Sequence, residues 1–284
     1  MIRGLLFLIL LFLLFSYCKK DAVVTDDFSD IPDYQYLFLA HTRLADGDEN
    51  KLDKRAEKID YSDYDMLLLG GDLTIETSID TSTLVYIDSI YSLSNENTLL
   101  ALGNHDYDNT DLVSHITGRP RYYIYYKNRI TFLVLDTQDS LSNIVGNQLD
   151  LVRKVTDTIS ESTHLVVLLH KLIWLYGNPE LSEYKNITNG GMGGGFQQVN
   201  PNNFWDDIYP MFLKALNRQV EVICIAGDLG EYNKNFEYET EQGIHLLACG
   251  LYVDDENDKA LILKHNFEKS IITWNFKKVD FLIN

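Results

Sequence analysis

The first half of the chain contains three short apolar runs that alternate with helix-like segments. The runs span residues 36–40, 66–69 and 98–102, and helix-like patterns occupy residues 52–59 and 84–92. This alternation is typical of parallel strands joined by helical crossovers. Open sheets of this kind hold their ligands beyond the carboxyl ends of the strands. We therefore expect functional side chains directly after each run.

Polar groups that can bind a metal occur at those places. Gly70-Gly71-Asp72 follows the second run, and Gly103-Asn104-His105-Asp106 follows the third. A later apolar run, residues 165–169, stops at His170. Taken alone, Asn-His-Asp is an ordinary polar turn. Because several strand ends deliver a carboxylate, an amide or an imidazole, the combination predicts a metal site.

The rest of the chain predicts a mainly β second half. Residues 122–126 and 130–136, separated by a short polar stretch, have the pattern of a hairpin. Residues 147–159 and 204–216 carry apolar side chains at helical spacing. Further strands are expected at residues 220–226, 244–248, 260–264 and 271–276.

One long segment lacks any periodicity. Residues 176–203 include a glycine-rich stretch, and their place directly after His170 favours a loop over the site. Neither a repeat nor a linker interrupts the chain, so we expect one folded domain over residues 34–284. Cys224 and Cys249 lie in apolar runs without metal-finger spacing, and they are interpreted as buried thiols, with a disulfide between them as the alternative.

The amino terminus has the pattern of a targeting segment. An arginine precedes an apolar run over residues 5–15, which is shorter than the ~18 residues that span a bilayer, and residues 1–17 are interpreted as a signal peptide. Cys18 stands where a bacterial lipoprotein signal places its lipid-modified cysteine, although Tyr17 is larger than the usual preceding residue. Residues 18–33 are then interpreted as the anchor cysteine and an acidic tether. We expect lipid anchoring in a bacterial cell envelope, periplasmic or surface-exposed, with an uncleaved anchor or plain secretion as alternatives.

The overall charge narrows the range of partners. The formal net charge is -18 and the pI is near 4.6. A chain this acidic is repelled by a polyphosphate, so we expect no nucleic-acid partner. We also expect a monomer.

The order of these motifs resembles the calcineurin-like metallophosphoesterases. The resemblance extends over most of residues 36–276, and its most specific part is Gly-Asn-His-Asp after a strand. It implies an α/β fold, a four-layer α-β-β-α sandwich of two mixed β-sheets flanked by helices. The matching segments, in order, are Gly71-Asp72, Gly103-Asn104-His105-Asp106, Leu135-Asp136-Thr137, Gly146-x-Gln148-Leu149, His170 and Gly227.

The resemblance also implies roles for single residues. Members of the family typically hold two metal ions that bind a phosphate and activate a water. By resemblance, Asp72 takes the place of the bridging carboxylate, and Asn104 and His170 bind one metal. His105 would stabilise the phosphoryl oxygens or protonate the leaving oxygen. Asp106 would orient His105 or cap the turn, and we group it with the candidate catalytic residues.

Two motifs depart from the family pattern. The first motif, an aspartate and a histidine one residue apart, is replaced by His41 and Arg43. In the last motif, two histidines one residue apart are replaced by Asp228 and Gly230. Three of these four positions serve the same metal in the family. The fourth position, Asp228, belongs to the other metal, whose remaining ligands are unchanged. Asp228 offers that metal a carboxylate oxygen where the family has an imidazole.

These departures lead to a specific hypothesis, in which one divalent metal remains and Arg43 replaces the other. A guanidinium carries a permanent charge and can hold two phosphate oxygens, but it cannot acidify a water. His41 is then a candidate base, so the candidate catalytic residues include both His41 and Arg43. In the alternative interpretation Asp228 caps a turn, and Arg43 pairs with surface carboxylates, namely Asp46, Asp48 or Glu49.

The sequence therefore predicts a metal-dependent phosphoesterase that is exported and tethered to a membrane. Its substrate would be a phosphorylated small molecule, lipid or glycan, and its metal would be Mn, Mg, Fe or Zn. The alternative is a catalytically inactive lipoprotein of the same fold that binds a phosphate-bearing or glycan ligand.

Overall fold

The computed structural model describes residues 32–44, 50–189, 200–252 and 255–283. The expected signal peptide and the anchor at Cys18 lie outside these residues, as does the glycine-rich part of the long segment. None of the helices among the described residues has the length and hydropathy that crossing a membrane requires.

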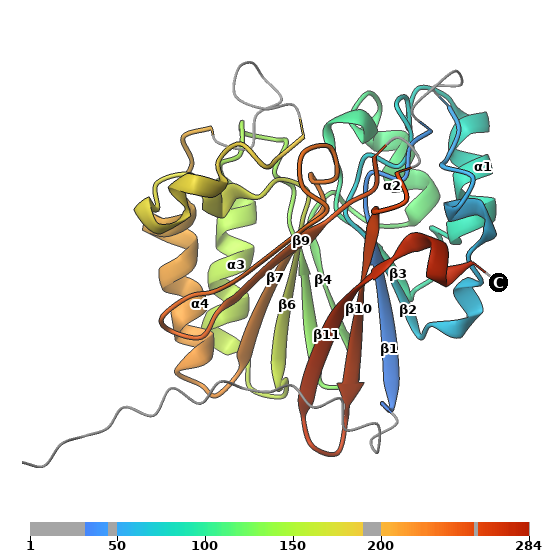
Figure 1. Ribbon diagram of the computed structural model, residues 1–284. Helices are drawn as coiled ribbons and strands as arrows, with labels where there is room; N and C mark the ends of the chain where they lie inside the picture. Colours follow the sequence, from blue (N-terminus) through green and yellow to red (C-terminus); the bar gives the residue numbers. More distant parts are fainter. Residues whose placement is uncertain (1–31, 45–49, 190–199, 253–254, 284) are drawn as a thin grey trace, which may run out of the picture. The chain divides into compact units, whose positions relative to one another are not determined.

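The chain between Pro32 and the carboxyl end folds around two β-sheets (Figure 1). The first sheet has the order β11-β10-β1-β2-β3. The strands expected in the first half of the chain pair in parallel, and the two carboxyl-terminal strands add an antiparallel edge. Their bounds are β1 (Tyr34–Leu39), β2 (Met66–Leu69), β3 (Thr98–Leu100), β10 (Lys259–Asn266) and β11 (Ile271–Lys278).

The second sheet has the order β4-β5-β6-β7-β9-β8. Its four central strands are parallel, and an antiparallel strand closes each edge. The hairpin expected from the sequence forms as β4 and β5. The bounds are β4 (Tyr123–Lys127), β5 (Ile130–Val134), β6 (His164–Leu169), β7 (Glu221–Ala226), β8 (Asn235–Glu239) and β9 (His245–Cys249).

Alternation along the strands divides the core into layers. In β1, Tyr36 and Phe38 belong to a cluster that includes residues of both sheets, whereas Leu37 and Leu39 pack in another cluster with α1 (Thr81–Tyr91). This follows from the side-chain period of two in a strand. A third cluster joins the second sheet to α3 (Gly146–Thr158) and α4 (Tyr209–Leu216). The four-layer sandwich of two mixed sheets with outer helices is therefore confirmed.

The first two α-helices begin at polar residues that cap them. Asp80 and Asn109 cap the first two helices by accepting hydrogen bonds from Thr83 N and Leu112 N. The α-helical bounds are α1 (Thr81–Tyr91), α2 (Thr110–Thr117), α3 (Gly146–Thr158) and α4 (Tyr209–Leu216). Shorter helices are η1 (Ala56–Lys58), η2 (Tyr61–Asp63), η3 (Asn104–Asp106), η4 (Ile173–Leu175), η5 (Pro179–Tyr184), η6 (Phe204–Ile208) and η7 (Val279–Leu282).

Several expectations about single elements are wrong. The helix expected over residues 52–59 is only η1, because Leu52 and Ile59 make isolated β-bridges on either side of it. Residues 204–216 form a π-helical turn followed by α4 rather than one α-helix. The long segment after His170 is not structureless, since it contains η5. Neither α2 nor β8 was expected. Cys224 and Cys249 are free and buried, as predicted.

Candidate metal centre

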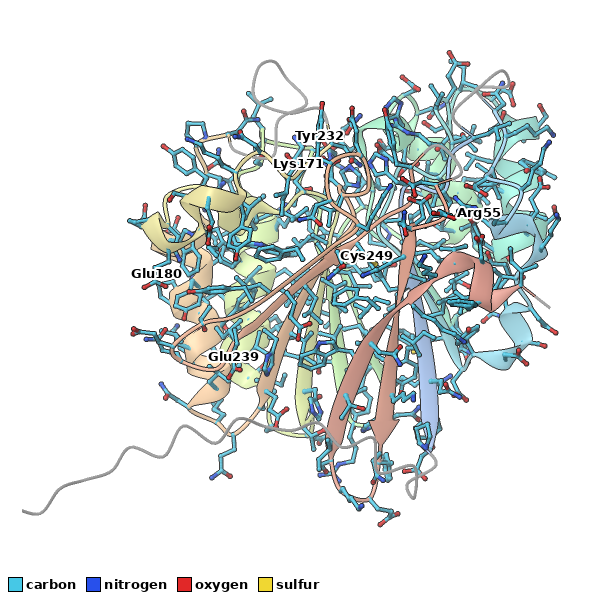
Figure 2. The ribbon with its side chains drawn as sticks, in the orientation of Figure 1. Arg55, Lys171, Glu180, Tyr232, Glu239 and Cys249 are labelled. Carbon is cyan, nitrogen blue, oxygen red and sulfur yellow. The ribbon has the colours of Figure 1, made fainter. Side chains whose placement is uncertain are left out.

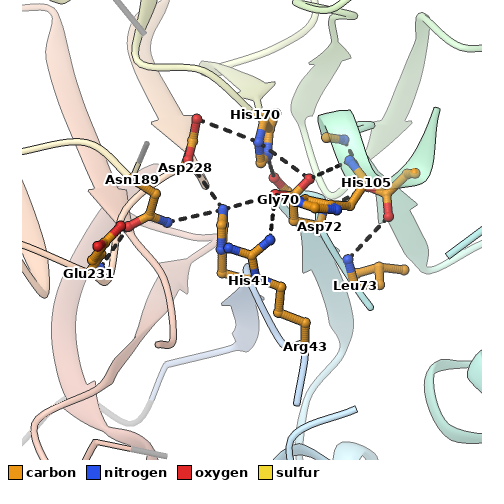
Figure 3. A network of polar contacts seen from close by, with 12 residues as sticks. His41, Arg43, Gly70, Asp72, Leu73, His105, His170, Asn189, Asp228 and Glu231 are labelled. Carbon is orange, nitrogen blue, oxygen red and sulfur yellow. Dashed lines mark hydrogen bonds and ion pairs between the residues drawn. The ribbon is translucent and has the colours of Figure 1, made fainter. Parts of the chain in front are cut away.

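Residues from both sheets meet beyond the carboxyl ends of five parallel strands. His41 and Arg43 follow β1, and Asp72 follows β2. The loops after β3, β6 and β7 bring in the rest. A pocket of about 230 Å³ lies there. Figure 3 shows the polar contacts that join the side chains of this site. Its lining consists of His41, Arg43, Asp72, Asn104, His105, Asn189 and Asp228.

Asp72 stands at the centre of this site. Its backbone has φ 54°, a left-handed conformation that costs energy for a residue with a Cβ. Its side chain is 2% exposed, and Oδ1 accepts a hydrogen bond from His105 N at 3.0 Å. Burial by itself would raise the pKa of Asp72, but the imidazoles of His170 and His41 hold that pKa well below its usual range. The carboxylate is therefore ionised and available to a cation.

Asp106 holds the Asp72 loop in place through its carboxylate. Asp106 Oδ2 accepts hydrogen bonds from Asp72 N at 2.7 Å and Gly103 N at 2.8 Å, while Oδ1 accepts one from Leu73 N at 3.1 Å. The side chain is fully buried and does not line the pocket. Asp106 therefore caps the turn, which was one of the two roles expected for it. Its place among the candidate catalytic residues is corrected to that of a positioning residue, because its lone pairs are directed at backbone N–H groups.

His170 has the surroundings of a metal ligand. Its Nδ1 donates to Gly70 O at 2.7 Å, which leaves the lone pair of the neutral ring on Nε2. Among the described residues nothing hydrogen-bonds this buried Nε2. It lies 3.6 Å from Asp72 Oδ1 and 3.7 Å from Asp228 Oδ2. Donor atoms that share one cation at about 2.0–2.2 Å lie roughly 3–4 Å apart, so these three side chains fit a metal.

Gly103 keeps this space open. A Cβ at position 103 would lie 2.1 Å from Asp72 Oδ1 and 2.8 Å from the His170 ring. Only glycine lets the loop after β3 approach both ligands so closely. The same loop places Asn104 in the pocket wall, where its amide oxygen is a further candidate ligand.

His41 lies between the two carboxylates of the site. Its Nε2 is 3.1 Å from Asp72 Oδ2 and 3.2 Å from Asp228 Oδ1, and its ring stacks on that of His170 with centroids 5.6 Å apart. Burial by itself would lower the pKa of His41, but Asp72 and Asp228 raise it above its usual value. Because its pKa is raised, the ring more readily carries its second proton at neutral pH, and in that state it has no lone pair to act as a base. His41, Asp72 and His170 also form a group with donor atoms within 4.8 Å of one another, so the structure favours a charge-pairing or ligand role over that of a base.

Arg43 and His105 border the open side of the pocket. Arg43 Nη1 is 3.8 Å from Asp72 Oδ2, so the guanidinium is turned toward the site. The carboxylates of the alternative pairing lie outside the described residues. His105 Nδ1 donates to Ile75 O at 2.7 Å, and its Nε2 is 4.0 Å from Asp72 Oδ2. Their side chains are 20% and 29% exposed, which leaves both accessible to a ligand.

The sequence did not single out Asn189 or Lys171. Asn189 lies in the segment expected as a loop over the site, with Nδ2 3.0 Å from His41 Nε2 and Oδ1 accepting from Glu231 N at 2.7 Å. Lys171 is 1% exposed directly after His170, and burial lowers its pKa despite the neighbouring carboxylates of Asp228 and Asp136. Neither residue belongs to a sequence motif. Lys171 could have been found from its position directly after a buried strand, whereas no sequence signal indicated Asn189.

Comparison with known protein families agrees with the motif order. The family model described as "Calcineurin-like phosphoesterase" matches residues 28–187. No curated protein matches the sequence. Among solved structures, an archaeal phosphodiesterase is similar at 10% identity, with 86% of this chain and 99% of that chain covered and a TM-score of 0.37.

Two further solved structures are similar at the same level. The 5'-nucleotidase precursor of Thermus thermophilus has 11% identity and a TM-score of 0.44, with 88% of this chain but only 56% of that chain covered. Zinc-bound Vps29 from Entamoeba histolytica has 8% identity and a TM-score of 0.33, with 86% and 99% covered.

The hydrogen bonds that Asp106 accepts predict that replacing it by asparagine destabilises the folded protein. Asp106→Asn replaces one acceptor oxygen by an amide that faces backbone N–H groups, so we expect a loss of roughly 1–3 kcal/mol in the free energy of unfolding. We also expect metal affinity to fall about 10–100-fold, because the Asp72 loop is released. Urea unfolding and titration with Mn²⁺ measure the two effects. Asp108→Asn, two residues further on and exposed, is the control. Equal stability of the two variants would contradict the role of Asp106.

Proposed function

Because this chain belongs to the calcineurin-like phosphoesterase family, we propose that it hydrolyses a phosphoester with one divalent cation and with Arg43 in the place of a second. The observation that carries this proposal is the buried Nε2 of His170, which has no hydrogen-bond partner within the described part of the chain and faces Asp72 and Asp228, with the Arg43 guanidinium on the other side of Asp72. One half of the site thus offers metal ligands, and the other half offers a fixed positive charge.

The cation would be held by Asp72, Asn104, His170 and Asp228, with His41 within reach of the same carboxylates. A bound Mn, Mg, Fe or Zn ion supplies Lewis acidity and lowers the pKa of a water. Carboxylate, amide and imidazole donors suit each of these metals, so the ligand set selects none of them.

The remaining steps depend on side chains that line the pocket. Arg43 would bind two nonbridging phosphate oxygens through its planar guanidinium and neutralise charge that develops on them. His105 holds one proton on Nδ1, which donates to Ile75 O, and in its doubly protonated form it would donate the second proton, on Nε2, to the leaving oxygen. His41 would offset the charge of Asp72 and Asp228 through Nε2.

Asp72 and His105 have different roles in this scheme, one holding the metal and the other donating a proton, so changing each residue separately tests the proposed catalysis. We expect Asp72→Asn to abolish both metal binding and hydrolysis of an aryl phosphate or a bis-aryl phosphodiester. His105→Asn should keep the metal and lower kcat about 10²–10⁴-fold, because it removes the proton donor alone. Steady-state kinetics and metal analysis of the same samples distinguish the two effects. His115→Asn, on the exposed face of α2, should match the unchanged protein.

If the unchanged protein binds metal but shows no rate above background with any of the four metals, the catalytic proposal fails. That result would favour the alternative, a lipoprotein that binds a phosphate-bearing or glycan ligand without hydrolysing it.

The single-ion proposal has its own test. We expect one metal per chain, and we expect the double change of His41→Asp and Arg43→His to raise the number toward two, because it restores an oxygen donor and a nitrogen donor. Position 230 is left unchanged, since Gly230 has φ 136° and a Cβ there would lie 2.7 Å from Leu251 O. Equilibrium dialysis followed by elemental analysis measures the number, with Arg153→His as an exposed control. Two metals in the unchanged protein would exclude the proposal.

We also propose that the protein is exported as a monomer and held at a bacterial membrane by lipid on Cys18. The support is the sequence of residues 1–33, with its apolar run and acidic tether. Mass spectrometry of the protein recovered from membranes should show an amino-terminal Cys18 that carries acyl chains. An amino terminus at Met1 or an unmodified Cys18 would contradict anchoring. For a protein anchored in this way, the phosphoester substrate would be a small molecule, lipid or glycan within reach of the envelope surface.

A further inference from the structure

A second pocket lies apart from the metal centre, beside the edge strand β8 of the second sheet. Its volume is about 170 Å³. None of its lining residues belongs to the metal-centre pocket. Figure 2 shows Glu180 at the outer side of the molecule, whereas Lys171, next to the metal-centre residue His170, lies toward the middle. Six residues of the lining set its chemistry, namely Glu180, Trp205, Tyr209, Tyr238, Glu241 and Gln242.

Three aromatic side chains contribute to the walls. The rings of Trp205 and Tyr209 have centroids 4.7 Å apart and planes inclined by 52°, so they form a corner rather than a stack. The π-helical turn η6 and the start of α4 place them side by side. Tyr238 comes from β8. The face of an aromatic ring carries partial negative charge, which attracts a cation.

The hydrogen-bond donors of these aromatic side chains are already used within the protein. Trp205 Nε1 donates to Trp174 O at 2.9 Å, Tyr209 donates its hydroxyl to Gln242 Oε1, and Tyr238 donates its hydroxyl to Glu180 Oε2. A phenol that donates to a carboxylate becomes richer in electrons. The hydrogen bond from Tyr238 to Glu180 raises the pKa of Tyr238 to about 12. The aromatic walls therefore present π-faces and few donors.

The charge of the pocket has one sign. Glu180 and Glu241 contribute carboxylates, and no Lys, Arg or His lines the pocket among the described residues. Asn178 fixes the position of Glu180 by accepting a hydrogen bond from its N–H at 2.9 Å. An anion would be repelled here, whereas a cation gains from both the carboxylates and the rings.

We propose that this pocket binds an organic ammonium group, of the size of a trimethylammonium or alkylammonium head group. Aromatic faces combined with carboxylates attract such a cation even when it has no N–H to donate. The volume is below the roughly 300 Å³ of a site for a larger ligand, which agrees with a head group alone. A neutral sugar finds donors in the side-chain amides of Asn178 and Gln242, but it gains nothing from the charge of Glu180 and Glu241, whereas a cation does. The proposal does not depend on the metal centre or on hydrolysis.

The test compares a cation with its neutral isostere. The full chain, in a polyoxyethylene detergent, is titrated with choline and separately with 3,3-dimethyl-1-butanol, in which a carbon replaces the nitrogen. Calorimetry or protein-observed NMR gives the affinities. We expect choline to bind at least about tenfold more tightly than the neutral alcohol. We expect Glu241→Gln to weaken choline about three- to tenfold, and Trp205→Leu to weaken it more.

Two controls keep the test decisive. Glu239→Gln removes a charge from the last residue of β8, two positions before Glu241 and outside the pocket lining, so it should leave choline affinity unchanged. If Trp205→Leu fails to fold, the exposed Glu241→Gln variant decides. Equal affinity for choline and the alcohol, loss of affinity in Glu239→Gln as large as in Glu241→Gln, or binding of methyl glucoside in place of choline would overturn the proposal. The rate of phosphoester hydrolysis is not part of any of these readouts.

Discussion

The carboxylate of Asp106 makes the contacts on which the metal centre depends. It lies fully buried between two loops that follow neighbouring strands of the first sheet, and it accepts hydrogen bonds from three backbone N–H groups, those of Asp72, Leu73 and Gly103. Those bonds hold Asp72 in a left-handed conformation that the residue would not adopt on its own. The side chains that approach Asp72 are those of His41, Arg43, His105 and His170. Because Asp106 holds Asp72 in position, the geometry of the whole site depends on the buried carboxylate of Asp106.

Two buried carboxylates, Asp72 and Asp228, create the second constraint. Burying them in this pocket is costly unless positive charge lies close by. In this chain the replacements of the family's first motif supply part of that charge, since His41 contacts both carboxylates and Arg43 is directed toward Asp72. This is the physical reason why the altered motif still forms a coherent site. It also explains why we propose one cation, on the side of His170, rather than none or two.

The two sites differ in how the sequence encodes them. The metal centre lies at the ends of strands that are buried on both faces, so apolar runs followed by polar residues already indicated it. The pocket beside β8 uses an edge strand, Asn235–Glu239, in which charged and aromatic residues alternate, and a π-helical turn at Phe204–Ile208. A short exposed strand has no continuous apolar run, and a π-turn does not keep the 3.6-residue period. For these reasons the sequence did not predict β8, and it did not predict that residues 204–216 divide into η6 and α4.

The sequence by itself determined the order of the buried strands, the four-layer sandwich and the family, because apolar runs and a Gly-Asn-His-Asp turn are local signals. It did not determine what Asp106, His41 or Asn189 contact. Only the tertiary structure decided that Asp106 is directed at backbone N–H groups, that His41 lies between two carboxylates, and that Asn189 reaches His41 from a segment without periodicity. The reason is that, apart from the local bond between Asp106 and Gly103, these contacts join loops between 33 and 187 residues apart in the sequence, where packing rather than local pattern sets each side chain's partner.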